Sequence, residues 1–537
     1  MARLFWGLDS STQSLSSIVI DLDSRKVVHE ASLNFDKTFP QYGTVNGVLR
    51  NSDPLVVHSP PLMWVDALDA MCERLRGDGV PMNEILAVAG SGQQHGSVYL
   101  NNRAADALKN LQPKKSLSAQ LARCLSRPTS PIWMDSSPIV ECVEIRKTLG
   151  GVAATARATG SDTFERFTGP QIRRFYKRQP QDYDRTACIC LVSSFMASLL
   201  AGQIAPIDHG DGSGMNLMDI RKKAWHPKAL AATAPNLREK LPPLAESWRV
   251  IGPVSSYFVE KYGLNPAALA VVWSGDNPCS LIGLGMVEEG TLAISLGTSY
   301  TCFGLMKTCR VDERGEGHVF VAPTGDYMSL ICFKNGSLAC ERIRDMYSYD
   351  WKQFTEAFRR TKPGNQGALM LPWFEPEIVP RINRPGLRRI NLDDRDADAN
   401  CRAVVEAQML SIRLHSAWMK VKARRVLATG GGSVNPAILQ VMADVMNCPV
   451  NRLEITKSAA LGAALRAAHA YLKHRRQPAR WTEVLRGFTE PPPNSEVRPD
   501  KRAASVYKKL IKQYAAAEKT ALEEMAAATQ RSRRMLV

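Results

Sequence analysis

Two hydroxyl-rich turns, one in each half of the chain, have the composition of phosphate-binding loops. In the first, Ser11, Thr12 and Gln13 lie between two apolar runs, and Asp9 stands at the end of the first run. In the second, Thr298 lies in a Gly/Ser/Thr turn between two similar runs. Backbone N–H groups and hydroxyls of such turns can hold phosphate oxygens, and Asp9 could meet magnesium directly or through water. Either turn alone could merely close a hairpin, but the repetition favours a pair of phosphate loops.

Three further segments place glycine beside polar side chains that could hold a small ligand. They are centred on His95, on Asp211 and on the pair Asp276 and Asn277. The glycines around His95 resemble a dinucleotide-binding loop, but such a loop opens a helix, whereas residues 97–100 have the pattern of a strand. Glycine instead lets the backbone approach a small polar ligand. Structural alternatives stay open: Asp211 in a plain turn, Asp276 as a helix cap and His95 as an interior histidine.

A glycine run near the C-terminal end of the chain could receive a flat ligand. An apolar strand at 426–429 leads into glycines that include Gly431 and Gly432, followed by Asn435 and a proline. Asparagine at the N-cap and proline at the first helical position are typical helix start signals. The glycines leave room for a ligand at that helix end.

Three large side chains stand where they could either fill the core or contact a ligand. Arg166 lies among apolar residues, and a charge in that context needs a partner or a ligand. Trp133 stands at the end of a short strand, and Trp351 follows the helix predicted at 339–347; each could equally be a core residue.

The elements that must position these side chains alternate between strands and helices. Residues 108–131 are predicted to be a basic surface insertion, and residues 363–380 to be rich in loops. Strands are predicted at 4–9, 15–21, 26–33, 85–89, 97–100, 291–296 and 426–429, and helices at 62–76, 193–201, 339–347, 404–420, 437–446 and 503–528.

The size and composition are those of an ordinary two-domain globular protein. The chain has 537 residues, of which 45% are hydrophobic and 23% charged, too many for a single core. No apolar run is long enough to span a membrane, and the N-terminus lacks a signal-peptide pattern, so we expect a cytosolic protein without membrane contact. The twelve cysteines are scattered. Cys188 and Cys190 lie in an apolar run that favours a buried element over a metal site.

The net charge of +17 raises the question of nucleic-acid binding. Part of the excess lies in an Ala-rich C-terminal segment whose basic residues are not interleaved with aromatics, which is typical of a solvated helix face. Specific nucleic-acid binding is therefore disfavoured, although a positive surface would help to attract a nucleotide. The sequence contains no GxxxxGK[ST], HExxH or EF-hand motif, which excludes a P-loop site.

Taken in order, these motifs resemble the FGGY carbohydrate kinases. The resemblance implies an α/β chain of two ribonuclease H-like domains of the actin-like ATPase fold with an interdomain cleft, at residues 1–283 and 284–537. It covers nearly the whole chain up to the C-terminal helix. The motifs that carry it are GLDSSTQS, SGQQHG, WMDSS, ERFTG, DGSGMN, SGDNP, SLGTS, FKNGS and TGGGSVN.

The resemblance also implies a role for each candidate residue, with ATP and magnesium as cofactors and a sugar as the partner molecule. It makes Asp211 the general base. The sugar would be bound by His95, Arg166, Asp276 and Asn277 together with Trp133. We expect His95 and Arg166 to act as hydrogen-bond donors. The phosphate loops would be Ser11, Thr12 and Gln13 with Asp9 near the metal, and Thr298; Gly431, Gly432, Asn435 and Trp351 would hold the adenosine.

Within the family, the motifs are most similar to those of members that act on D-xylulose. Another pentulose or polyol, such as ribulose or glycerol, is an alternative substrate, because a few side chains decide that choice. A different class, a non-catalytic actin-like nucleotide-binding protein, is disfavoured because it has no reason to combine Asp211 with the sugar-binding set. The sequence is compatible with either a monomer or a homodimer.

Overall fold

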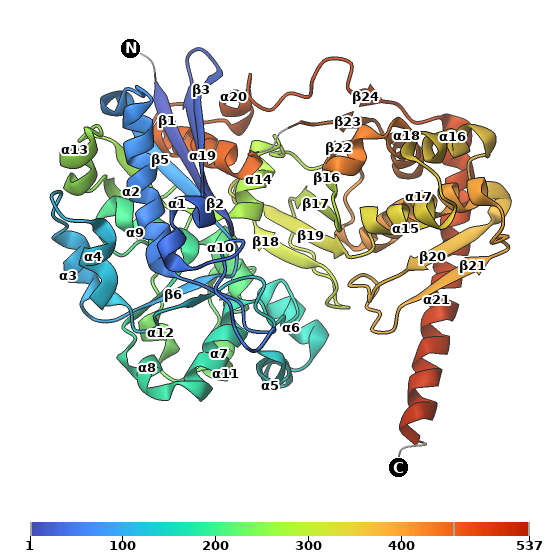
Figure 1. The fold of residues 1–537 in the computed structure, drawn as a ribbon, viewed down its shortest axis with the longest axis horizontal. Helices are drawn as coiled ribbons and strands as arrows, with labels where there is room; N and C mark the ends of the chain where they lie inside the picture. Colours follow the sequence, from blue (N-terminus) through green and yellow to red (C-terminus); the bar gives the residue numbers. More distant parts are fainter. Residues whose placement is uncertain (1–2, 455–456, 535–537) are drawn as a thin grey trace.

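The computed structural model describes residues 3–454 and 457–534, and it forms two lobes that are each built around a seven-stranded sheet (Figure 1). The first sheet has the order β13-β14-β5-β1-β2-β3, and β15 also pairs with β5. Its strands are β1 (Leu4–Ser10), β2 (Ser14–Asp21), β3 (Lys26–Asn34), β5 (Ile85–Gly92), β13 (Val250–Pro253), β14 (Leu269–Val271) and β15 (Ser274–Gly275).

The second sheet has the order β18-β19-β17-β16-β22-β23-β24. In both sheets an antiparallel hairpin leads into a parallel pairing: β1 pairs with β2 and β5 as β16 pairs with β17 and β22. This repetition confirms the predicted pair of hairpins and the two-domain actin-like fold. The strands are β16 (Thr291–Leu296), β17 (Tyr300–Met306), β18 (His318–Val321), β19 (Tyr327–Phe333), β22 (Arg425–Thr429), β23 (Val450–Arg452) and β24 (Glu496–Val497).

Strand β1 is buried on both faces, and its side chains alternate between two helical layers. Trp6 and Leu8 belong to the core under α2 (Pro61–Gly77) and α9 (Val192–Ala201), whereas Phe5 packs in a separate cluster with α19 (Ser458–His474). Gly7 lies directly under α19, and a Cβ added to it would stand 2.2 Å from the Ala460 carbonyl oxygen. A helix from the second half of the sequence thus covers the first sheet.

Helix α19 also ties together the strand ends that carry the polar motifs. Its buried Arg466 donates to the carbonyl oxygens of Gly90 (3.1 Å), Val272 (2.8 Å) and Ser247 (2.8 Å). A guanidinium group has only donors, so three carbonyl acceptors are a suitable environment for it. The ends of β5 and β14 are therefore held by one side chain.

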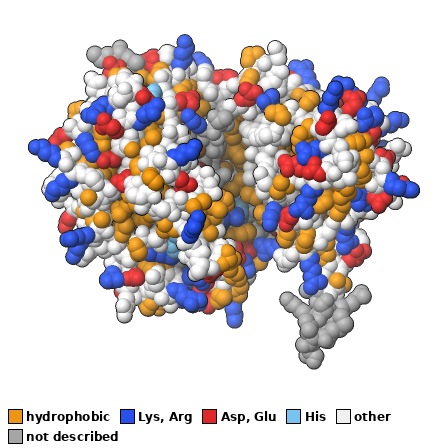
Figure 2. Space-filling view, viewed as in Figure 1, with side chains coloured by type: hydrophobic (Ala, Val, Ile, Leu, Met, Phe, Trp, Pro, Cys, Tyr) orange, Lys and Arg blue, Asp and Glu red, His pale blue; other side chains and the backbone are white. Residues whose placement is uncertain are grey.

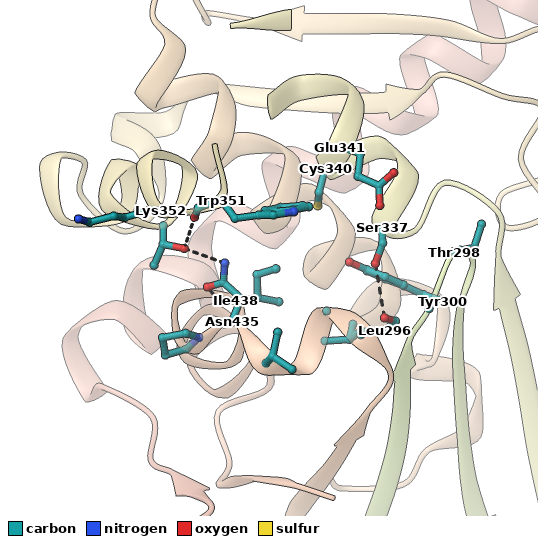
Figure 3. Close-up of a pocket in the computed structure, with 16 residues that line it drawn as sticks. Leu296, Thr298, Tyr300, Ser337, Cys340, Glu341, Trp351, Lys352, Asn435 and Ile438 are labelled. Carbon is teal, nitrogen blue, oxygen red and sulfur yellow. Dashed lines mark hydrogen bonds between the residues drawn. The ribbon is translucent and has the colours of Figure 1, made fainter. Parts of the chain in front are cut away.

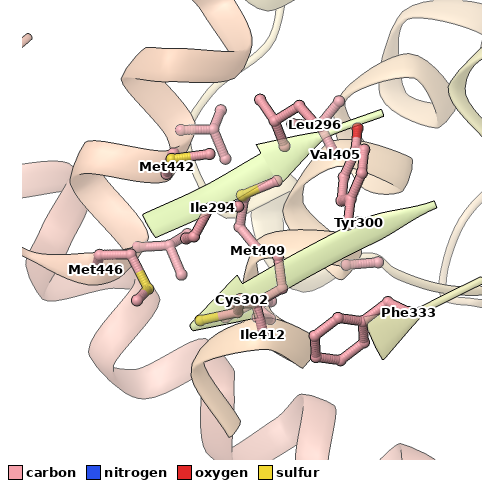
Figure 4. Close-up of a cluster of buried hydrophobic side chains, with 14 of the residues drawn as sticks. Ile294, Leu296, Tyr300, Cys302, Phe333, Val405, Met409, Ile412, Met442 and Met446 are labelled. Carbon is pink, nitrogen blue, oxygen red and sulfur yellow. The ribbon is translucent and has the colours of Figure 1, made fainter. Parts of the chain in front are cut away.

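The core of the second lobe lies between its sheet and the helices α17 (Ala397–His415) and α18 (Pro436–Met446) (Figure 4). Ile294 and Cys302 from the sheet face Met409 of α17 and Met442 of α18. Burial of such side chains contributes roughly 1.5–3 kcal/mol each. The cluster fixes the rear of β16 and β17, whose connecting turn contains Thr298.

Two sequence predictions need correction, and a third, the loop-rich segment at 363–380, is confirmed but needs an addition. The insertion at 108–131 is not simply surface, because Leu117 is fully buried and the Arg127 guanidinium lies 4.8 Å from the Phe175 ring. Residues 363–380 contain a buried strand, β20 (Leu369–Trp373), which pairs with β21 (Gly386–Ile390). The C-terminal helix α21 (Lys501–Arg534) packs its first half inward through the buried Tyr507 and Tyr514.

The two closely spaced cysteines belong to a strand. Cys188 and Cys190 lie in strand β8 (Cys188–Leu191), as the apolar run predicted, and their sulfur atoms are 3.7 Å apart as free thiols.

Within residues 3–454 and 457–534, no helix combines the length and the apolar character needed to cross a membrane.

Candidate active site

A polar cluster forms in the first lobe where three neighbouring strands end. Asp9 on β1 lies opposite Ser91 on β5, and Ser91 lies opposite Ser274 on β15. Helices α10 (His209–Gly212) and α14 (Asp276–Gly283) begin beside these strand ends. The strand register therefore brings together motifs that are far apart in the sequence.

Asp211 is a deeply buried acid of this cluster, with 1% of its surface exposed. Its Oδ2 accepts a hydrogen bond from Ser193 Oγ, and its backbone N–H donates to Asp208 Oδ1 at 2.7 Å. Its Oδ1 has no partner among the described residues, and a Cβ on Gly275 would lie 2.9 Å from it. One carboxylate oxygen is thus anchored and the other is free to accept.

Burial raises the pKa of Asp211 well above its ordinary value. The hydrogen bond from Ser193 opposes this shift, and the nearby charges of Asp208 and Asp276 add to it. A carboxylate that is costly to ionise is a stronger proton acceptor once it is ionised. An aspartate in an ordinary exposed turn would have neither this burial nor this raised pKa, so the interpretation of Asp211 as a plain turn residue is not supported.

The pair Asp276 and Asn277 extends the cluster toward Gln94. Asn277 Nδ2 donates to Gln94 Oε1 at 2.8 Å, while Gln94 Nε2 is buried without a partner among the described residues. Asp276 is the first residue of α14 and not its N-cap, which is Gly275. Burial raises the pKa of Asp276 to about 6. Asn277 Nδ2 also donates to Asp276 Oδ1 at 3.1 Å, so the unused donor beside the pair, among the described residues, is Gln94 Nε2.

His95 contributes an acceptor, which corrects our expectation of a donor. Its Nδ1 lies 2.8 Å from the Gly214 carbonyl oxygen, and because a carbonyl only accepts, Nδ1 carries the proton and Nε2 keeps a lone pair. Burial and the charge of Arg166 lower the pKa of His95 to about 3, so the ring stays neutral. The φ of His95 is +72°, a costly conformation that the surrounding structure must enforce.

Two further predicted residues lie at the edge of this cluster. Arg166 Nη2 donates to His318 Nε2 at 3.0 Å, and His318 belongs to β18 of the second lobe. Trp133 is 45% exposed, so the core interpretation is wrong, and its indole N–H donates to Thr12 Oγ1 at 2.9 Å. Thr12 Oγ1 in turn donates to Gln93 Oε1 at 3.4 Å, which connects the first hydroxyl-rich turn to the segment that carries Gln94.

Asp9 offers a place for a cation. Its Oδ1 accepts from Ser91 Oγ at 2.7 Å, and burial, with a further contribution from the charge of Asp276, raises the pKa of Asp9 to about 7. No group of three or more His, Cys, Asp or Glu side chains suited to a metal occurs within the described ranges. A single carboxylate suits magnesium, which is usually held by one or two carboxylates together with water and substrate phosphates.

A pocket of about 720 Å³ opens in the second lobe (Figure 3). Five of its lining residues are predicted to bind the nucleotide: Thr298, Trp351, Gly431, Gly432 and Asn435. The remaining lining residues are Leu296, Gly297, Tyr300, Ser337, Cys340, Glu341, Lys352, Thr355, Val434, Pro436 and Ile438.

The walls of this pocket suit a flat ligand. Trp351 is 42% exposed along one side, and the Arg344 guanidinium lies 4.6 Å from its ring, so the core interpretation is wrong here too. Asn435 caps α18 by accepting from the Ala437 N–H at 3.0 Å, as the sequence predicted. A Cβ on Gly431 would meet no heavy atom within 4 Å.

The remaining nucleotide candidates lie across a groove from this pocket. Ser11, Thr12 and Gln13 form the β1–β2 turn of the first lobe and do not line the pocket. Figure 2 shows the groove between the two lobes. Ser193 and His318 were not predicted, because each reaches the site from an element whose own sequence carries no motif. Asp208 was not predicted either, although it is the N-cap of the helix that carries Asp211.

Comparison with known proteins agrees with this geometry. The sequence model of the N-terminal domain of the FGGY family of carbohydrate kinases matches residues 4–283, and that of the C-terminal domain matches residues 292–471. The chain is 41% identical to xylulose kinase of Rattus norvegicus over 97% of its length and 98% of that protein. It is 42% identical to xylulose kinase 2 of Arabidopsis thaliana over 87% of each chain.

Solved structures share the fold. A xylulose kinase from Rhodospirillum rubrum superposes with a TM-score of 0.80 at 20% identity, over 96% of this chain and 99% of that one. A Plasmodium falciparum glycerol kinase with ADP gives 0.77 at 15% identity, over 97% and 98%. With both family domains matched along most of its length, the chain belongs to the FGGY family of carbohydrate kinases.

Proposed function

We propose that this kinase transfers the terminal phosphoryl group of ATP to D-xylulose and forms D-xylulose 5-phosphate. Support comes from the relatives of 41% and 42% identity that are named xylulose kinase. The observation that carries the proposal is the carboxylate of Asp211, which is buried with one oxygen anchored by Ser193 and the other without a partner among the described residues.

Asp211 acts as the general base in this proposal. Phosphoryl transfer passes through a loose transition state, so alignment and charge neutralisation matter more than covalent chemistry. The free Oδ1 orients the sugar hydroxyl and accepts its proton late in the reaction. Such general-base assistance contributes about 10²- to 10⁴-fold. Asn277, Gln94 and the lone pair of His95 Nε2 hold the other hydroxyls.

The nucleotide lies with its adenine beside Trp351 and Gly431, and its phosphates reach the groove. Thr298 then meets the phosphates from the second lobe, and Ser11, Thr12 and Gln13 meet them from the first. Asp9 would hold a magnesium ion, which would supply positive charge to offset the phosphate oxygens. Because both lobes contribute, we expect ATP and sugar together to draw the lobes closer.

An ADP-release assay over D-xylulose, D-ribulose, L-ribulose and glycerol tests the proposal. We expect the kcat/KM for D-xylulose to exceed that for every other acceptor by at least about tenfold, the size of one well-placed hydrogen bond. If another acceptor were preferred, the proposed substrate would be wrong, but the proposed role of Asp211 would be unaffected. ADP release that no acceptor stimulates would instead indicate a nucleotide-binding protein without sugar chemistry.

A further inference from the structure

The edge strand of the second sheet is attached to the first lobe beside the polar cluster. Strand β18 stands at the end of its sheet and pairs with β19 there. Toward the first lobe, the Val319 N–H donates to the Gly160 carbonyl oxygen at 3.0 Å, and the Val321 N–H donates to Ser213 Oγ at 3.0 Å. Ser213 follows directly after α10, which carries Asp211. The unused edge of β18 is therefore fixed next to the proposed base.

This attachment places His318 against Arg166. His318 is 1% exposed, and its Nε2 lies 3.0 Å from Arg166 Nη2. A guanidinium group has no lone pair, so His318 Nε2 must be the acceptor and the imidazole must be neutral, with its proton on Nδ1. Burial and the charge of Arg166 lower the pKa of His318 well below its ordinary value, which agrees with the neutral form.

Aromatic rings hold both partners in place. The His318 ring lies 4.8 Å from Phe164 and 5.4 Å from Phe167, and the Arg166 guanidinium lies 5.1 Å from Phe164. His95 packs on Phe167 at 4.4 Å. His95 and Arg166 therefore pack against one aromatic cluster, to which the second lobe contributes His318.

We propose that His318 is a positioning residue for sugar binding: the second lobe supplies the acceptor that orients Arg166 toward the ketose. The sugar site is then complete only while β18 is attached to the first lobe. The inference depends on the proposed sugar site, but not on which ketose or polyol occupies it. A purely structural role predicts instead a loss of stability that does not depend on Arg166.

A double-mutant cycle distinguishes these roles. The variants are His318→Leu, which removes the acceptor, His318→Gln, which retains one, Arg166→Ala, and the double variant His318→Leu with Arg166→Ala. Val319→Ala is the matched control, because Val319 is the next residue on the same strand and is as deeply buried as His318. The readouts are the KM for the preferred sugar, the KM for ATP and the Tm.

We expect His318→Leu to raise the KM for the sugar by about tenfold or more, which is the loss of one hydrogen bond to a charged group, with the KM for ATP changed less than about twofold. His318→Gln should recover part of this loss. In the Arg166→Ala background the same change should have little further effect. Additive effects, or equal changes in both KM values, would overturn the inference. Failure of the wild-type protein to use any sugar would refute the proposed function instead.

Discussion

The two lobes repeat one strand plan and yet present opposite kinds of surface to the groove. In the first lobe, Asp9, Asp211 and Asp276 come together, and burial raises the pKa of all three. In the second lobe, the equivalent hairpin borders an open pocket whose charged lining residues are Glu341 and Lys352. The shared fold thus provides two hairpin turns, while the segments that follow the strands give the first lobe its buried acids and the second lobe its open pocket.

The largest expected effect comes from removing the acid of the first lobe. Asp211→Asn should lower kcat by about 10²- to 10⁴-fold, because an amide cannot accept the sugar proton. The affinity for ADP should stay within about twofold, since no predicted nucleotide contact is lost. Steady-state kinetics and calorimetry measure the two quantities. The exposed Asp184→Asn in the same lobe is the control, and turnover by Asp211→Asn near the wild-type rate would contradict the assignment.

A matched pair of glycine substitutions sharpens the contrast between the lobes. A Cβ on Gly275 would lie 2.3 Å from Gln94 Cγ and 2.9 Å from Asp211 Oδ1, whereas one on Gly431 would meet no heavy atom within 4 Å. We expect Gly275→Ala to reduce kcat/KM by about 100-fold or more, since small displacements of reacting groups have such costs. Gly431→Ala should change it by less than about threefold. Equal effects would show that the two sites are equally crowded.

A smaller effect is expected from the aromatic wall of the second pocket. Trp351→Ala should raise the KM for ATP by about tenfold, the contribution of one stacked base. The KM for D-xylulose should not change, because Trp351 lies in the other lobe from the sugar site. Trp351→Phe should restore most of the affinity. A rise confined to the sugar KM would reverse the assignment of the lobes.

The smallest effect concerns stability and its dependence on pH. The folded pKa of Asp9, about 7, lies above its ordinary value of 3.8, so its favourable contribution is fully present below about pH 3.8 and is lost as the pH rises through about 7. At higher pH the folded protein holds an ionised carboxylate in a buried site, which lowers its stability, and Asp9→Asn removes that cost. We therefore expect the variant to gain a few degrees in Tm over the wild type at pH 8 and less at pH 5. A Tm difference that is the same at both pH values would exclude this explanation.

The sequence was most informative where one short segment contains both the functional side chains and the residues that determine its backbone conformation. The hydroxyl turns at Ser11 and Thr298, and the Asn435 start signal, are local patterns, and the structure places each where the pattern predicted. Ser193 and His318 could not be found in this way. A buried serine inside an apolar helix and a histidine in an edge strand acquire their roles only when distant strands meet.

The misread regions have a related cause. The insertion at 108–131 was interpreted from its charge, but its leucines, among them Leu117 and Leu121, face the core at helical spacing. Arg127 is buried against aromatic rings, where a planar cation is tolerated. Helix α19 looks like any Ala-rich helix in the sequence. Its place over the first sheet becomes clear only from tertiary contacts such as the close approach of Gly7 to Ala460.

A crystal structure with D-xylulose, ADP and magnesium would test the division between the lobes most directly. The account predicts the adenine against Trp351, the phosphates between the Thr12 and Thr298 turns, and the terminal sugar hydroxyl within hydrogen-bonding distance of Asp211 Oδ1. A nucleotide bound outside the second-lobe pocket, or a sugar whose hydroxyls do not reach Asp211, would contradict it.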